Sequence, residues 1–158
     1  MSFASVESAI QTSKSHLSQL DATSPTTLEV QQYLVTSVVV LLVAEFEYAL
    51  QGMFGERAEK SKDVELIAFS KHNLTRRFRN PDIGKINEAL GYFSAAYEAG
   101  FSTQILNSSI HLAWDNIIRA RHEAAHGRVP SNMTIMELEK SCEEARKLFD
   151  VLRAALGL

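Results

Sequence analysis

The segment VVVLLVAEFEYAL, residues 38–50, is the most apolar part of this 158-residue chain and decides its fold class. It begins with three β-branched valines, which would also suit a buried strand. The flanking segments LEVQQYL and AEFEYALQGMF, however, keep the helical spacing of apolar residues for several turns. We therefore expect a central helix over residues 27–55 that is apolar on all sides. The uninterrupted apolar run from Val38 to Ala44 is far shorter than the roughly 20 residues of a membrane span, which predicts a buried element.

Helical periodicity also dominates the rest of the chain, and the stop signals fall between the periodic segments. Prolines restrict the residues before them at Ser24-Pro25 and Asn80-Pro81, and Gly100, Gly127 and Gly157 stand where left-handed C-terminal caps are expected. The expected helices span residues 3–20, 27–55, 62–79, 83–99, 107–126 and 134–156. This pattern predicts an all-α fold, an antiparallel bundle of about five to six helices that forms a single domain over residues 1–158.

Composition limits the class of protein further. The chain is 46% hydrophobic and carries a net charge of −3, which argues against a protein that coats nucleic acid by bulk electrostatics. The single cysteine, Cys142, cannot form an internal disulfide, and the N-terminal residues lack the continuous apolar core of a signal peptide. We therefore expect a cytoplasmic protein without a membrane partner.

Charge is concentrated in the segment KHNLTRRFRNPDIGK, residues 71–85, in which a single acid, Asp82, faces a group of basic residues. The basic residues are Lys71, Arg76, Arg77, Arg79 and Lys85. One interpretation is a solvated helix end whose cations lie favourably near a helix C-terminus. The other is an anion-binding patch, which becomes relevant if a second feature implies a phosphate-bearing ligand.

The second feature is the segment RARHEAAHG, residues 119–127, at the end of the helix expected over residues 107–126. At roughly 100° per residue, Arg121 falls in the middle of the apolar side of this helix, whereas Arg119, His122 and His126 align with Asp115 on the other side. A buried arginine must be paired or face a polar cavity. Its partner would be a carboxylate such as Glu45 or Glu47 on the central helix.

The residues Arg121-His122-Glu123-Ala124-Ala125-His126 resemble the Arg-x4-6-His signature of the HEPN superfamily, in which a polar residue follows the arginine and the Ala-His-Gly ending is typical. Two further segments resemble one branch, the RiboL-PSP-like HEPN proteins. VVVLLVAEFEYAL is similar to its hydrophobic helix, and FRNPDIGKINEALGYF, residues 78–93, is similar to its Asn-Pro turn and following helix. The resemblance covers residues 35–130 in order.

The resemblance implies a metal-independent endoribonuclease without a cofactor, acting as a toxin, an antiviral defence component or an RNA-processing enzyme. It implies a homodimer whose motif helices meet at a two-fold axis, with RNA as the substrate and an antitoxin or another operon-encoded protein as a further partner. Arg121 and His126 would be the catalytic pair. The supporting residues would be His122, Arg119 and Glu47, and the RNA-binding residues would be Arg128, Arg76, Arg77, Arg79 and Lys85.

Other interpretations remain open at this point. Arg119 and His126 also fit the signature with six intervening residues, so Arg119 is a second candidate for the catalytic arginine. A HEPN-like dimer without catalysis would bind RNA, a nucleotide or a protein, and a purely structural bundle would be a monomer with a buried Arg121–Glu pair. A metal site is not expected, because His111, His122 and His126 lack further ligands at a recognised spacing.

Overall fold

The computed structural model describes residues 3–21, 23–126 and 133–158. Within these ranges the chain forms seven α-helices and no strand, which confirms the predicted all-α class. In chain order the helices are α1 (Ala4–Leu17), α2 (Pro25–Glu59), α3 (Val64–Arg77), α4 (Ile83–Phe93), α5 (Ala95–Ile105), α6 (Ser109–Ala125) and α7 (Ile135–Leu156).

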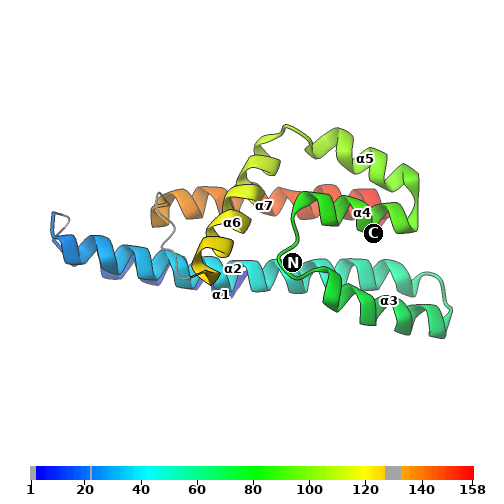
Figure 1. Cartoon of the computed structure of the whole chain (residues 1–158), viewed down its shortest axis with the longest axis horizontal. Helices are drawn as coiled ribbons and strands as arrows, with labels where there is room; N and C mark the ends of the chain where they lie inside the picture. The colour runs from blue at the N-terminus through cyan, green and yellow to red at the C-terminus, as the bar shows by residue number, and fades with distance from the viewer. Residues whose placement is uncertain (1–2, 22, 127–132) are drawn as a thin grey trace.

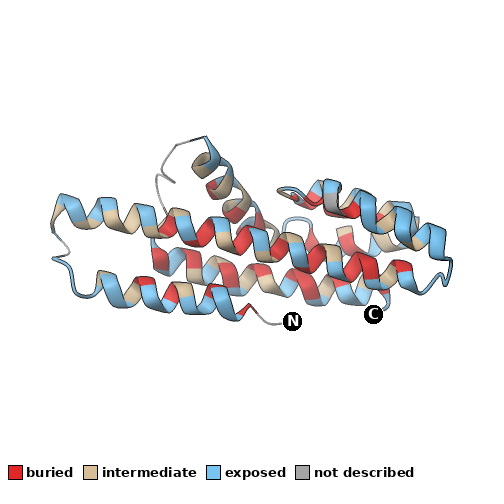
Figure 2. Cartoon of the chain, turned by 90° about the horizontal axis from the view of Figure 1, so that it is seen from below, coloured by how far each residue is buried: buried red, intermediate tan, exposed pale blue. Residues whose placement is uncertain are grey.

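The long helix α2 is the centre of the arrangement, as predicted. Pro25 stands in its first turn, where the missing N–H leaves no hydrogen bond unmade. Helices α1, α3, α6 and α7 all pack against it (Figure 1). The prediction that the run from Val38 to Ala44 is a buried element is correct only in part, because Val38 and Val39 are buried while Val40 is exposed, as is Tyr48 further along the helix. The exposed stripe is visible along the same helix in Figure 2.

Length and composition alone would allow α2 to cross a membrane, since an 18-residue window within it has a mean hydropathy of 1.8. Of that window, 44% is buried inside the structure. A core helix meets the same criteria, and the contacts of α2 with four other helices place it in the core.

Neighbouring helices in the chain form antiparallel hairpins, namely α1 with α2, α2 with α3, and α4 with α5 (Figure 1). The helices α2 and α7 instead run in the same direction, and α6 crosses them obliquely (Figure 1). The predicted antiparallel arrangement is therefore correct for these three pairs but not for the pairing of α2 with α7.

The helix expected over residues 83–99 is two helices, which accounts for the larger number of helices. Ser94 has an extended backbone, with φ −168° and ψ 135°, and its Oγ accepts a hydrogen bond from the N–H of Ala96 at 3.2 Å. This side-chain cap begins α5 and competes with continuation of the helical backbone. Gly100, expected to end a helix, lies inside α5. Gly157 does end α7 in the left-handed conformation, with φ 64°.

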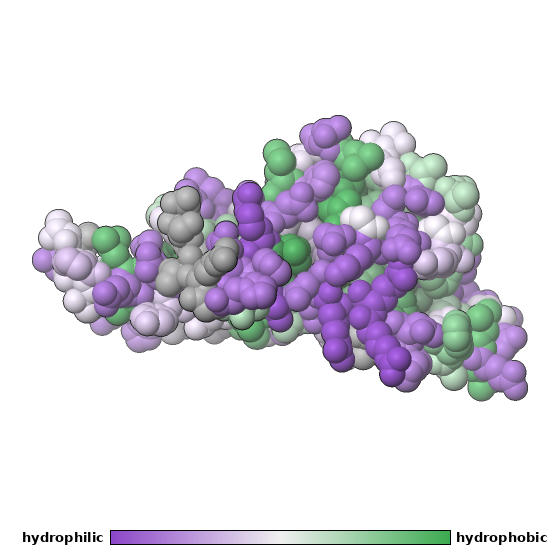
Figure 3. All heavy atoms as spheres, viewed as in Figure 1, coloured by the Kyte–Doolittle hydropathy of each residue, from purple (hydrophilic) through white to green (hydrophobic). Residues whose placement is uncertain are grey.

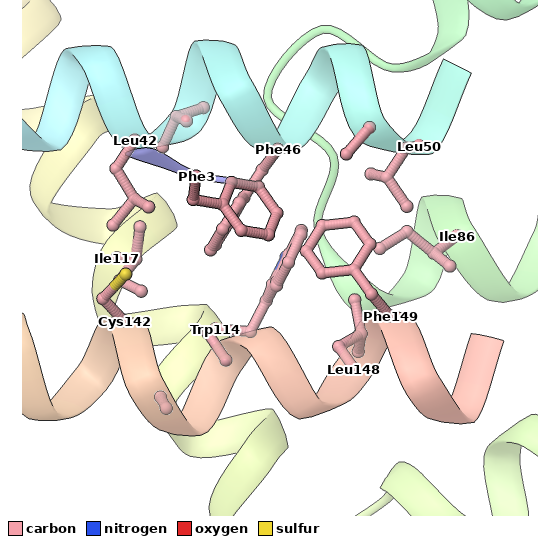
Figure 4. Packing of buried hydrophobic residues seen from close by; sticks show 14 of the residues in the cluster. Phe3, Leu42, Phe46, Leu50, Ile86, Trp114, Ile117, Cys142, Leu148 and Phe149 are labelled. Atoms are coloured by element: carbon pink, nitrogen blue, oxygen red, sulfur yellow. The ribbon is translucent and has the colours of Figure 1, made fainter. Parts of the chain in front are cut away.

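An aromatic cluster joins α1, α2, α6 and α7. Phe46 of α2 stacks on Trp114 of α6, with ring centroids 4.8 Å apart and an interplanar angle of 8°. Phe149 of α7 meets the Phe46 ring edge-on at 5.2 Å, and Phe3 lies 5.4 Å from Phe46 (Figure 4). Each such ring buries a large apolar area, so this cluster fixes where α6 crosses the other helices.

Candidate functional site

The first half of α6 is anchored to the rest of the molecule by a cap and by its tryptophan. The Oγ of Ser108 accepts a hydrogen bond from the N–H of His111 at 3.2 Å and so starts the helix. The buried indole Nε1 of Trp114 donates to the carbonyl oxygen of Pro81 at 2.7 Å. A buried indole N–H needs such a partner. The bond therefore ties α6 to the Asn80-Pro81 turn, at which the sequence predicts a helix break.

The connection between α3 and α4 is held by three polar contacts around Asn80. Asn80 has a positive φ of 47°, a conformation that asparagine tolerates better than most residues. Its N–H donates to Oε1 of Glu47 at 2.7 Å. The Nζ of Lys85 donates to the carbonyl oxygens of Arg79 at 3.3 Å and of Asn80 at 3.2 Å. The predicted break at Asn80-Pro81 is thus correct, and its cations are held in a defined turn.

This turn and α6 line an open surface pocket of about 590 Å³. The lining residues are Arg79, Asn80, Asp82 and Lys85 from the turn, and Asp115, Ile118, Arg119 and His122 from α6. A volume of this order lies within the range of small-ligand sites, roughly 300–1,000 Å³. Hydrophilic side chains gather over this part of the surface in Figure 3. The structure therefore brings two separate features of the sequence, the basic segment and the RARHEAAHG helix, to one site.

The acids of the pocket are already engaged by neighbouring groups. Asp82 caps α4 by accepting from the N–H of Lys85 at 2.7 Å, and Asp115 pairs with Nε2 of His111 at 3.2 Å. Arg119 is exposed and donates to the side chain of Asn116. Arg119 and Arg79 both line the pocket, and a guanidinium matches the geometry of a phosphate group. The pocket is suited to an anion.

The two histidines of the motif lie beside this pocket at the end of α6. The rings of His122 and His126 meet edge-on, with an interplanar angle of 69° and ring centroids 4.4 Å apart. His122 lines the pocket, while His126 is the exposed residue at the C-terminal cap of the helix. Arg119, His122 and His126 therefore share one side of α6.

Arg121 is half-buried and projects from a different part of α6 than the pocket-lining residues. Its side chain makes no hydrogen bond or ion pair with the described residues. The carboxylates considered as partners are occupied elsewhere: Glu45 accepts from Oγ of Ser5 at 2.7 Å, and Glu47 accepts from Asn80. The buried Arg121–Glu pair of the purely structural interpretation is therefore not formed within the described part of the chain. Glu47 positions the Asn80 turn instead.

The predicted RNA-binding residues do not all lie at the pocket. Arg79 and Lys85 are at the pocket. Arg77 lies outside it, with its guanidinium 2.5 Å from Oε2 of Glu88 and 4.6 Å from the centre of the Tyr92 ring. Arg76 is exposed on α3. Arg128 lies outside the described residues, as does Gly127, the predicted helix stop.

No group of three or more His, Cys, Asp or Glu side chains within the described ranges is arranged to hold a metal ion. Cys142 is buried in α7, and this burial raises the pKa of its thiol. The acidic sequence around it also predicts a raised pKa, but desolvation is the larger cause. The chemistry available at the site is that of guanidinium, ammonium and imidazole groups.

The chain is an all-α bundle in which an Arg- and His-bearing helix end lies beside an Asn-Pro turn. The model of the RiboL-PSP-HEPN family matches residues 4–157. The chain therefore belongs to the RiboL-PSP-HEPN family, as its sequence predicts. No curated protein and no solved structure matches it.

Proposed function

We propose that this protein is a metal-independent endoribonuclease of the HEPN type, acting as a homodimer in a toxin, antiviral-defence or RNA-processing role. The observation that carries the proposal is the pocket of about 590 Å³, in which Arg79 and Lys85 meet Arg119 and His122. Membership of the RiboL-PSP-HEPN family supports the same activity. The alternative is a HEPN dimer that binds RNA, a nucleotide or a protein without cleaving it.

The side chains at the end of α6 suit RNA cleavage without a metal. In that reaction a base removes the proton of the 2′-hydroxyl, the 2′-oxygen attacks phosphorus, and an acid protonates the departing 5′-oxygen. An unperturbed imidazole, with a pKa of about 6.5, serves either role near neutral pH. His126 is assigned to proton transfer and Arg121 to the charge that develops on the phosphate oxygens. His122 would orient His126, and Arg119, Arg79 and Lys85 would bind flanking phosphates.

A second copy of the chain is part of this proposal for a geometric reason. Residues five positions apart in a helix project about 140° from each other, so Arg121 and His126 of one chain do not converge on one atom. A two-fold axis at this end of α6 would bring Arg121 of one copy towards His126 of the other. Arg119 and His126 lie on the same side of α6 within one chain, so a catalytic pair of Arg119 and His126 needs no second copy.

The first experiment measures cleavage of single-stranded RNA oligonucleotides in the presence of EDTA. The proteins are wild type, His126→Ala, Arg121→Gln and Arg119→Gln. His16→Ala is the matched control, because His16 is an exposed histidine on α1. We expect cleavage by wild type and the control, and a loss of about 10²-fold or more in His126→Ala. A larger loss in Arg119→Gln than in Arg121→Gln would assign the catalytic arginine to Arg119.

A mixing experiment tests the dimer separately. Copies carrying Arg121→Gln and copies carrying His126→Ala are each expected to be inactive. Mixed dimers would contain one intact Arg121 and one intact His126 and should recover part of the wild-type rate. Absence of recovery in a confirmed mixed dimer would contradict a site shared between copies. Binding without cleavage by every protein, wild type included, would favour the binding-module alternative.

A further inference from the structure

Helix α3 packs on the molecule along one side only, and it presents large apolar side chains to solvent on the other side. It contacts α2 through Leu74, which is buried, whereas Phe69 is 68% exposed and Leu66 is 49% exposed. Figure 3 shows apolar side chains over the first half of α3 next to strongly hydrophilic ones over its second half. An exposed apolar group rimmed by polar residues marks an interaction surface. We call Leu66, Phe69, Asn73 and Arg76 the outer face of α3.

The spacing of these residues aligns them in a row that leads towards the candidate site. Phe69, Asn73 and Arg76 are separated by four and three positions, so they lie above one another on the helix. The side-chain amide of Asn73 donates to the carbonyl oxygen of Phe69 at 2.8 Å. Phe69 and Arg76 are two turns apart, about 10.5 Å along the axis. Arg79, three residues further on, lines the pocket at α6.

The charge along this row favours an anionic occupant at the end nearest the pocket. Arg76 is exposed, and it makes no hydrogen bond or ion pair with the residues that the structure describes. Arg77 differs, because its charge is balanced by Glu88 at 2.5 Å. The acid on this side of α3, Glu65, lies in the first turn, one turn before Phe69 and about three turns from Arg76. An unpaired cation between an exposed aromatic ring and a cationic pocket complements a chain that carries both phosphates and flat bases.

We propose that the outer face of α3 binds single-stranded RNA and leads it into the pocket at α6, with a base stacked on Phe69 and a backbone phosphate held by Arg76. The proposal rests on the proposed function for its ligand. Aromatic side chains serve this role because every base offers a π-face, and each stacked base contributes a factor of roughly 5 to 150 in affinity. Recognition along α3 is therefore expected to tolerate different base sequences.

The test measures RNA binding by fluorescence anisotropy in a His126→Ala background, in which cleavage does not interfere. Phe69→Ala should weaken binding of a single-stranded oligonucleotide about ten-fold. Phe69→Trp should preserve binding, while Phe69→Leu should not restore it. Tyr33→Ala is the matched control, because Tyr33 is an aromatic residue of similar exposure in the first half of α2. Arg76→Gln should weaken binding and reduce its salt dependence by about one phosphate contact.

An oligonucleotide with abasic residues distinguishes stacking from a general loss of affinity. Removing the stacked base should cost as much as Phe69→Ala, and the two changes together should cost no more than either alone. Equal RNA affinities for Phe69→Ala and Tyr33→Ala would overturn the proposal and assign α3 to a protein contact. Phe69-dependent binding by a protein that never cleaves RNA would support it while the ribonuclease proposal fails. Cleavage by wild type with no effect of Phe69→Ala on RNA binding would support the ribonuclease proposal and overturn the role of α3 in RNA binding.

Discussion

The two halves of α6 differ in what holds them. In the first half, Ala113, Trp114 and Ile117 are buried, and Trp114 is fixed by stacking on Phe46 and by its hydrogen bond to Pro81. In the second half, Arg119 and His122 are exposed, and Ala120 is the one buried residue. The first half is thus held by burial, whereas the polar residues of the second half are placed by the helix that carries them.

This difference separates stability from function along one helix. Buried apolar groups contribute most of the folding free energy, and truncating them leaves cavities. Exposed polar side chains away from caps and ion pairs contribute little. The second half of α6 can therefore carry reactive groups without a large effect on folding, and substitutions in the two halves should have separable consequences.

The largest expected effect is on stability, from Trp114→Ala. Removing this buried ring leaves a cavity beside Phe46 and an unpaired carbonyl at Pro81, and it should lower the free energy of unfolding by about 3–5 kcal/mol. Urea unfolding followed by circular dichroism measures the loss. Leu112→Ala is the control on the same helix, because Leu112 is 64% exposed. Its cost should stay within about 0.5 kcal/mol. Equal losses in the two variants would contradict the anchoring of the first half of α6 by the buried Trp114 ring.

The next effect should fall on activity alone, from Arg121→Gln. Arg121 has no hydrogen bond or ion pair with the described residues, so the free energy of unfolding should change by less than about 0.5 kcal/mol. The rate of RNA cleavage should nevertheless fall about 100-fold, as expected when a donor to a developing oxyanion is removed. A buried, paired arginine would instead cost about 3–5 kcal/mol on truncation. Urea unfolding and a cleavage assay on one preparation distinguish these outcomes.

A smaller effect is expected from Glu47→Ala, which tests how the pocket is positioned from α2. The carboxylate of Glu47 accepts the N–H of Asn80 at 2.7 Å, and a hydrogen bond to a charged group contributes about 1.5–3 kcal/mol. We expect a loss of about 1.5 kcal/mol in unfolding free energy and weaker RNA binding in the His126→Ala background. Glu45→Ala is the matched control, since Glu45 contacts the exposed Ser5 at the other side of α2. Unchanged RNA affinity in Glu47→Ala would show that the turn does not need this contact.

Much of the fold follows from the sequence, because its strongest signals are local. Apolar spacing locates the helices to within a few residues, and Pro25, the Asn80-Pro81 pair and Gly157 mark real boundaries. The exception is residues 83–99, where apolar spacing continues through Ser94 although the backbone does not. A serine inside an apolar pattern does not by itself predict a helix cap. The hydrogen bond from Ala96 to Ser94 that begins α5 is evident only in the three-dimensional structure.

The candidate site is less accessible from the sequence because it joins distant residues. The motif and the basic segment are each recognisable alone, but their meeting depends on the Trp114–Pro81 hydrogen bond, between residues 33 positions apart. Glu47 illustrates the same limit. Its residue type indicates a partner for a positive group such as Arg121, whereas the three-dimensional arrangement gives it a backbone N–H at Asn80. Asp115 shares its helix side with Arg119 and His122 in the sequence pattern, but nothing in the sequence indicates that Ile118 lines the pocket.

The smallest effect concerns the helix that follows the motif. The C-terminal cap of α6 at His126 is formed by backbone hydrogen bonds, whereas α7 begins with a capping box in which Thr134 and Glu137 each bind the other's backbone N–H. Thr134→Ala should lower the free energy of unfolding by about 1 kcal/mol, measured by urea unfolding at pH 7. Met136→Ala, at an exposed position two residues later, is the control. A negligible loss in Thr134→Ala would mean that tertiary packing alone fixes the start of α7.

The same cap should respond to acid in a defined direction. Hydrogen bonds from the N–H and then the hydroxyl of Thr134 hold the pKa of Glu137 below its ordinary value of 4.5. Because the folded-state pKa is the lower one, the contribution of Glu137 is complete above the unfolded-state pKa and is lost as the pH falls through the folded-state pKa. The difference in unfolding free energy between wild type and Glu137→Gln should therefore be constant from pH 7 to about pH 5 and shrink below about pH 4. Glu143→Gln makes the same charge change on α7 away from the cap. An equal pH dependence in both variants would show that net charge, and not the cap, is responsible.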